Sequence, residues 1–143
     1  MIYSQASEYA IRALVYLARG PSCRFVPAKD IAQAEKIPWC FLAKILETLA
    51  KKRMLRSSRG RDGGFTLRLD PGEICLLDIV KALDEVVCFE QCAMGHPKCS
   101  VKHSCPMHDR WTELRLHIKR YLQRITIAGL ASRPDGRRDG DNG

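Results

Sequence analysis

Three features are scarce or missing in this 143-residue sequence. No apolar run approaches the roughly 20 residues that a membrane-spanning helix needs. The first residues lack a basic segment followed by an apolar one, so we expect no secretory signal and a cytoplasmic protein without a membrane partner. Acidic residues are also in deficit, with 16 Asp and Glu against 24 Lys and Arg. The length fits one domain, and the 45% hydrophobic content excludes a disordered chain.

The net charge of +8 is unevenly distributed. Residues 132–143 carry equal numbers of bases and acids, and their Gly, Asp and Arg content predicts a disordered tail. The excess therefore lies in residues 1–131. Residues 51–61 hold no acid and six bases, which are Lys51, Lys52, Arg53, Arg56, Arg59 and Arg61. Such a patch indicates a polyanionic partner, most simply nucleic acid, because releasing condensed counterions drives the binding.

The first half of the chain has the pattern of a winged helix-turn-helix. Apolar spacing predicts helices over residues 7–18, over 27–34 and from Pro38 to about residue 51. A tight turn between the second and third helices is typical of a helix-turn-helix, in which the third would enter the major groove. Two short alternating segments around a Gly-rich turn, within residues 54–69, predict a basic hairpin that follows as the wing.

The predicted winged helix-turn-helix indicates which residues would contact DNA. We expect Lys44 to face base edges together with its neighbours Trp39, Cys40 and Ala43. We expect four bases outside that face to contact phosphates or the minor groove, namely Lys29, Arg56, Arg59 and Arg61.

The second half predicts a sensor loop and a dimer. Helical spacing resumes over residues 74–86, and residues 88–108 then lack any period. Beyond them, apolar residues at spacings of three and four predict a long helix over about 107–125 that packs on a partner helix, which implies a homodimer. They are Trp111, Leu114, Ile118, Tyr121 and Ile125. Thr126 is expected to cap a last short helix that ends at Ala131.

Cysteine use points to metal or redox chemistry. An odd count of seven, with no export signal, argues against a disulfide framework. Residues 88–108 concentrate four of the cysteines and three of the four histidines. Gaps of six and five residues separate Cys92, Cys99 and Cys105. These gaps are wider than the usual zinc knuckles, whereas iron-sulfur clusters accept thiolates spread along a loop. A zinc site and a loop of unliganded thiols are the alternatives.

Several segments together carry a resemblance to a known family. They are residues 8–14, the recognition helix at 42–49, the wing at 60–65, residues 79–84, the spaced cysteines and residues 125–128. Over almost the whole chain, to about Ala131, the sequence resembles the IscR/NsrR-like family of winged helix-turn-helix iron-sulfur transcriptional regulators. The resemblance implies a dimeric repressor, not an enzyme, whose cluster state alters its affinity for a palindromic operator. It implies a signal of iron, redox state or nitric oxide.

The resemblance also supplies a ligand set. Three cysteines would hold the cluster, here Cys92, Cys99 and Cys105, and a 2Fe-2S cluster is favoured over 4Fe-4S. The fourth ligand would be His108 in an IscR-like site, or Glu8 of the partner subunit in an NsrR-like site. Cys88 is a third alternative, since its sulfur is a good iron ligand although its position lies outside the family pattern.

The predicted fold class is therefore mainly α. A winged helix-turn-helix regulator domain occupies residues 1–131, with its DNA-binding part at about 1–70, and it carries a cysteine-rich loop at 88–108 and a long C-terminal dimerisation helix. Two functional alternatives remain. One is a zinc-bound or cluster-free thiol-based DNA-binding regulator, and the other is an iron-sulfur electron-transfer protein, which would leave the helix-turn-helix and wing unexplained.

Overall fold

The computed structural model describes residues 2–84, 90–96 and 105–134. One antiparallel hairpin accompanies the helices, and this confirms the predicted mainly α, winged helix-turn-helix fold. In chain order the elements are α1 (Gln5–Arg19), α2 (Ala28–Glu35), α3 (Trp39–Lys51), β1 (Leu55–Ser58), β2 (Gly64–Leu67), the 3-10 turn η1 (Pro71–Glu73), α4 (Leu76–Leu83), α5 (His108–Arg124) and α6 (Ile127–Ala131). Within the described ranges, no helix combines the length and apolar character needed to cross a membrane.

The apolar stripes that predict the helices also form the core. The N-terminus of α1 is capped by Ser4, whose side chain accepts a hydrogen bond from the Ser7 N–H, and its stripe buries Leu14 and Leu17. In α3 the buried set is Leu42, Ile45, Leu46 and Leu49. These faces meet α4 and α6 in one continuous core. Burying a side chain of this size contributes about 1.5–3 kcal/mol, as an upper bound, so this core dominates the stability.

The base of the wing is fixed to the chain between α1 and α2. Val26 and Phe65 exchange two backbone hydrogen bonds, with N–O distances of 2.9 and 2.8 Å. Gly64 beside them has a φ of +142°, and a Cβ there would lie 2.3 Å from the Val26 carbonyl oxygen. Only glycine fits this close backbone approach. The hairpin therefore has a firm base, and its turn extends beyond it.

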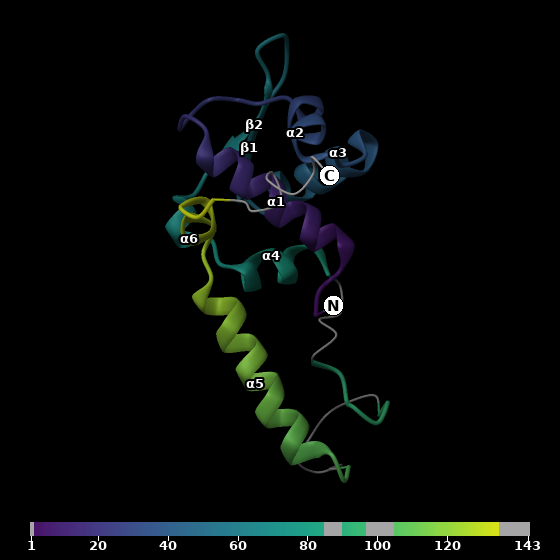
Figure 1. Ribbon diagram of the computed structural model, residues 1–143. Helices are drawn as coiled ribbons and strands as arrows, with labels where there is room; N and C mark the ends of the chain where they lie inside the picture. The colour runs from purple at the N-terminus through teal and green to yellow at the C-terminus, as the bar shows by residue number, and fades with distance from the viewer. Residues whose placement is uncertain (1, 85–89, 97–104, 135–143) are drawn as a thin grey trace, which may run out of the picture.

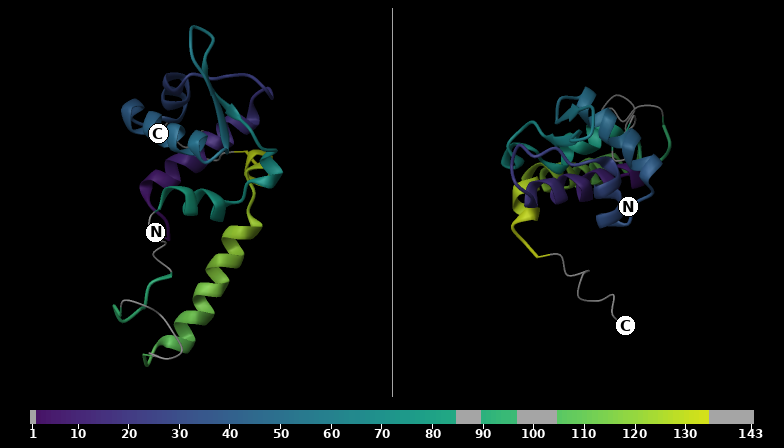
Figure 2. Two further views of the ribbon diagram at one scale, coloured as in Figure 1. Left: turned by 180° about the vertical axis from the view of Figure 1, so that it is seen from behind. Right: turned by 90° about the horizontal axis from the view of Figure 1, so that it is seen from above.

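The wing and α5 lie at opposite ends of the molecule. Figure 1 shows α2, α3 and the hairpin together at one end, while α5 runs away from the other end. The view from behind in Figure 2 shows the same separation. Helix α5 packs on α4, and Leu122, the buried residue of α5, joins the core there.

Helix α4 is shorter than the predicted span of 74–86. It begins at Leu76 because Cys75 is extended and acts as the N-cap, where its N–H bonds to the Asp78 carboxylate at 3.2 Å. It ends at Leu83 because Asp84 leaves the helical conformation, with φ −92° and ψ 115°. Asp84 is the last described residue before the cysteine-rich segment.

The predicted seam of α5 is divided between two faces. Trp111, Ile118 and Ile125 are partly buried against the core of their own chain. Leu114 and Tyr121 are instead 52% and 59% exposed. The division follows from the packing of α5 on α4, which uses part of the apolar stripe. The face left for a partner helix is therefore narrower than the sequence pattern predicts.

Candidate nucleic-acid interface and cysteine site

The N-terminal half of α3 presents an open surface. Trp39 is 47% exposed, and the Lys29 Nζ atom lies 4.6 Å from the centroid of its ring. Such a cation–π contact is worth about 0.5–1 kcal/mol at an exposed site and holds the two side chains together. Cys40 and Lys44 are exposed and Ala43 is half-buried. The structure thus brings Lys29 of α2 beside the predicted base-facing residues of α3.

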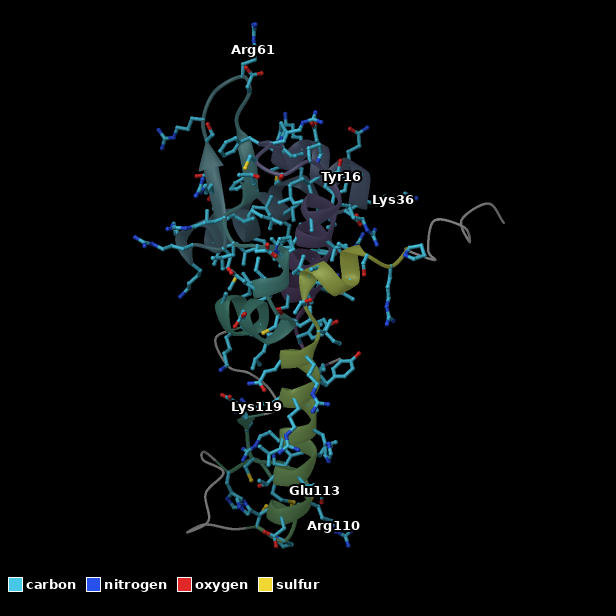
Figure 3. All side chains as sticks on the ribbon, turned by 90° about the vertical axis from the view of Figure 1, so that its left-hand side faces the viewer. Tyr16, Lys36, Arg61, Arg110, Glu113 and Lys119 are labelled. Carbon is cyan, nitrogen blue, oxygen red and sulfur yellow. The ribbon has the colours of Figure 1, made fainter. Side chains whose placement is uncertain are left out.

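The wing carries its arginines on the outside. Arg56 lies in β1, and Arg59 and Arg61 belong to the turn between the strands; all three are exposed. Figure 3 shows Arg61 at the tip of the hairpin, far from Arg110 at the other end of the molecule. Across the described residues, no acidic side chain forms an ion pair with any of these three arginines. They are available to a polyanion.

Helix α1 supports both helices of the helix-turn-helix. The Arg12 guanidinium contacts Glu35 at the end of α2, with its Nε 3.6 Å from Oε2, and also donates to the Glu35 carbonyl oxygen. The Tyr9 ring meets the Phe41 ring of α3 edge-on, with centroids 5.7 Å apart. A shift of α1 would therefore be transmitted to α2 and α3.

Two of the predicted ligand cysteines lie together. The sulfur atoms of Cys92 and Cys105 are 3.9 Å apart, and Cys92 is buried. The Met94 N–H donates to the Cys92 sulfur at 3.4 Å. Hydrogen bonds from the backbone N–H groups of Met94 and His96 lower the pKa of the Cys92 thiol, because they stabilise the thiolate. A thiolate is the form that binds a metal.

The segment that carries Cys92 is fastened to α5. The Trp111 indole N–H donates to the Gln91 carbonyl oxygen at 2.6 Å. The Lys119 Nζ atom lies 3.1 Å from Glu90 Oε1. These two contacts, made by the two residues that precede Cys92, are the features of this site that sequence reasoning missed. Trp111 was identified only as part of the apolar stripe, and the spacing of Glu90 and Lys119 carries no local signal.

Of the other candidate ligands, His108 and Glu8 lie within the described residues. His108 begins α5, and its N–H bonds to the Cys105 carbonyl oxygen at 3.0 Å. Glu8 lies on α1, where it lines a cavity of about 450 Å³ with Tyr3, Arg12 and Tyr121. Partial burial, reinforced by the negative charge of Glu8, raises the pKa of Tyr3. Cys88 and Cys99 lie outside the described residues. Among those described, no three His, Cys, Asp or Glu side chains gather as a metal-binding group.

Comparison with known proteins agrees with this architecture. The model of the family Rrf2, described as "Iron-dependent Transcriptional regulator", matches residues 3–133. A protein of Aquifex aeolicus (strain VF5), described as an HTH-type transcriptional regulator, is 36% identical over 132 residues, which cover 91% of each chain. The HTH-type transcriptional regulator IscR of Serratia proteamaculans (strain 568) is 30% identical over 135 residues, covering 94% of this chain and 82% of its own.

Solved structures share the fold. The global cysteine regulator CymR of B. subtilis superposes with a TM-score of 0.79 at 23% identity, over 94% of this chain and 99% of its own. IscR of T. potens gives a TM-score of 0.69 at 21% identity, over 97% and 96%. At these identities the likeness concerns the fold alone. The family match and the two relatives, at 30% and 36% identity, cover nine-tenths or more of the chain. The chain therefore belongs to the Rrf2 family of DNA-binding, non-enzymic transcriptional regulators.

Proposed function

We propose that this protein is a homodimeric cytoplasmic repressor that senses iron, redox state or nitric oxide through an iron-sulfur cluster. The observation that carries the proposal is the 3.9 Å separation of the Cys92 and Cys105 sulfurs. The segments that carry the pair, residues 90–96 and the chain leading into α5, lie at the end of the molecule away from α3 and the wing (Figure 1). This arrangement separates a sensing end from a DNA-binding end at about residues 1–70.

The sulfur geometry fits a tetrahedral metal. Metal–sulfur bonds of about 2.3 Å place two thiolates on one tetrahedral ion about 3.8 Å apart. Cys99 would be the third ligand and His108 the fourth, with Glu8 of the partner subunit or Cys88 as alternatives. When bound, the cluster, 2Fe-2S in preference to 4Fe-4S, supplies a redox-active group whose potential depends on its ligands and their hydrogen bonds.

The chain's own residues prepare this site. The Met94 N–H bonds to the Cys92 sulfur and favours the thiolate. Trp111 and Lys119 hold the segment of Cys92 against α5, so that Cys92 and Cys105 stay close. Within the described segment 90–96 all residues except Cys92 are exposed, and we therefore expect metal binding to contribute directly to its folding.

At the other end, the charged and exposed side chains would contact DNA. Lys44 would face base edges with Trp39, Cys40 and Ala43. Lys29, Arg56, Arg59 and Arg61 would hold phosphates or enter the minor groove. The cation–π contact between Lys29 and Trp39 limits the freedom of both side chains before DNA arrives.

A second copy would pair along α5. Leu114 and Tyr121, seven residues apart and therefore on the same side of this helix, are large, apolar and exposed. Two α5 helices covering these residues would place two recognition helices on two half-sites of a palindromic operator. Burial of the exposed apolar area drives such pairing.

The first test is anaerobic purification with an absorption spectrum and iron and sulfide analysis. We expect a brown protein that contains both iron and sulfide. Cys92→Ala, Cys99→Ala and Cys105→Ala should each lose the cluster, whereas Cys23→Ala serves as the matched control and should keep it. A colourless protein that contains zinc would overturn the iron-sulfur proposal and support a zinc-bound regulator instead. No bound metal would leave a thiol-based regulator.

Two further variants separate the candidates for the fourth ligand. His108→Ala should shift the spectrum or the reduction potential without abolishing the cluster, because another ligand can occupy one iron position. If Glu8→Ala shifts them and His108→Ala does not, the carboxylate is the ligand. Repressor function predicts that the protein lowers transcription from a promoter containing its operator in a purified system.

A further inference from the structure

The end of α4 is tied to the start of α1 by a cluster of hydrogen bonds around Asp84. The Ser7 hydroxyl donates to Asp84 Oδ1 at 3.1 Å, and the Ser4 N–H donates to Oδ2 at 3.2 Å. The Ser4 hydroxyl also donates to Oδ1. Ser7 is fully buried, and Ser4 is the N-cap of α1. A single carboxylate therefore serves both polar side chains at the first turn of α1.

The position of Asp84 is unfavourable for its own helix. A negative charge at the C-terminal end of a helix opposes the helix dipole, whereas at an N-terminus it is favourable. Asp84 follows the last residue of α4 and lies at the N-terminus of α1. Its charge stabilises α1 at the expense of α4. The presence of a carboxylate at this position is thus explained by the link between α4 and α1, and not by the stability of α4 alone.

This link lies between the two ends of the molecule. Asp84 lies four positions before Cys88, the first residue of the cysteine-rich segment, and Cys92 is eight residues further along the chain than Asp84. On the other side, α1 contacts α2 through Arg12 and Glu35 and contacts α3 through Tyr9 and Phe41. Any change that pulls Asp84 away from Ser4 and Ser7 would loosen the helix that supports the DNA-binding helices.

We propose that Asp84, with Ser4 and Ser7, is the positioning element that couples the state of the cysteine site to the helix-turn-helix. The inference rests on the proposed sensing function, because it names the residues through which that site acts. Asp84 does not contact DNA or a cluster in this account. It fixes α1 in one position when the cysteine segment is ordered and releases it when that segment changes.

The test compares operator affinity with and without cluster in a series of variants. The probe is a DNA duplex selected by the wild-type protein from a random library. Asp84→Ala should keep the cluster spectrum of the wild type, while the ratio of the two dissociation constants falls toward one. Ser7→Ala should change the ratio in the same direction. The matched control is Asp78→Ala. This acid lies at the opposite end of the same helix, where its carboxylate accepts from the Cys75 N–H, and its replacement should retain the wild-type ratio.

A second measurement does not depend on the cluster. In cluster-free Asp84→Ala protein, amide hydrogen exchange should become faster in the first turn of α1 and stay unchanged in the middle of α3. This readout also shows whether the variant is folded.

The outcomes distinguish the two proposals. A wild-type ratio of one would overturn the sensing function and the coupling with it. A wild-type ratio well away from one that Asp84→Ala retains to within about twofold would overturn the coupling alone. Unchanged exchange at the start of α1 in a folded Asp84→Ala protein would overturn it as well.

Discussion

The two ends of this molecule are stabilised in different ways. Helices α1, α3, α4 and α6 share a continuous core in which most buried side chains are fully covered. At the other end, Cys92 is the buried hydrophobic residue of the described segment 90–96, whereas the buried residue of α5, Leu122, belongs to the core. One indole hydrogen bond, one ion pair and a pair of thiols hold the segment in place.

Under the proposed function, this difference would make a small regulator rigid where it binds DNA and responsive where it senses. A region with few buried apolar contacts opens at low free-energy cost, and a ligand that binds only its ordered form stabilises it strongly. The core of the DNA-binding end needs no such ligand. We expect the two ends to respond very differently to the same kinds of substitution.

The largest contrast should come from leucine truncation. Leu46→Ala removes a fully buried side chain of α3 and should lower the free energy of unfolding by about 2–5 kcal/mol. Leu116→Ala, at an exposed position of α5 on the side opposite Leu114, should change it by less than about 0.5 kcal/mol. Urea unfolding followed by circular dichroism measures both. Similar losses for the two variants would contradict the view that the core lies at one end.

The next effect concerns the dimer. Leu114→Glu places a charge on the exposed apolar face of α5 and should yield monomers that bind a palindromic duplex at least about tenfold more weakly. Gln123→Glu, an exposed position on the opposite side of α5, is the control and should remain dimeric. Sedimentation measures the assembly. An intact Leu114→Glu dimer would place the interface elsewhere on the surface.

The wing arginines should have a smaller effect. Replacing Arg59 and Arg61 together with Ala should weaken DNA binding and reduce the salt slope by up to about two, because each phosphate contact contributes about 0.9 to the slope. Replacing Lys81 and Arg110, two exposed bases away from the wing, gives the same charge change and should leave the slope unaltered. If the slope is the same in both double variants, the wing does not contact phosphates.

The smallest effect concerns thiol reactivity. Burial raises the pKa of the Cys75 thiol, so less of it is thiolate at neutral pH. The exposed Cys23 and Cys40 should therefore react with iodoacetamide before Cys75, and the rate at Cys75 should increase as the pH rises. Peptide mass spectrometry resolves the order. Labelling of Cys75 first would contradict its partly buried position at the N-cap of α4.

Much of the DNA-binding end could be predicted from the sequence because its signals are local. The apolar spacing of Leu42, Ile45, Leu46 and Leu49 defines both α3 and its buried face. The glycines between the strands indicate the hairpin turn. The exposed positions of the basic residues then follow from where these residues lie on α3 and on the hairpin.

The cysteine end and its link to α1 were less predictable because their contacts join distant residues. Nothing in the spacing of Trp111 and Gln91 indicates that they bond, and the link from Asp84 to Ser4 crosses 80 positions. The apolar stripe of α5 predicts one continuous seam, yet Ile118 and Ile125 pack against the core of their own chain and Leu114 stays exposed. The spacing of apolar residues shows which face of a helix is apolar, but it does not show which neighbouring element covers that face.

The central claim is that the cysteine end controls the DNA-binding end. The most direct measurement is the affinity of one preparation for its selected duplex, determined anaerobically with the cluster bound and again after the cluster is removed. We predict dissociation constants that differ by at least about fivefold, the lower range of coupling between two sites. Equal affinities in the two states, with iron and sulfide present in the first, would contradict the account.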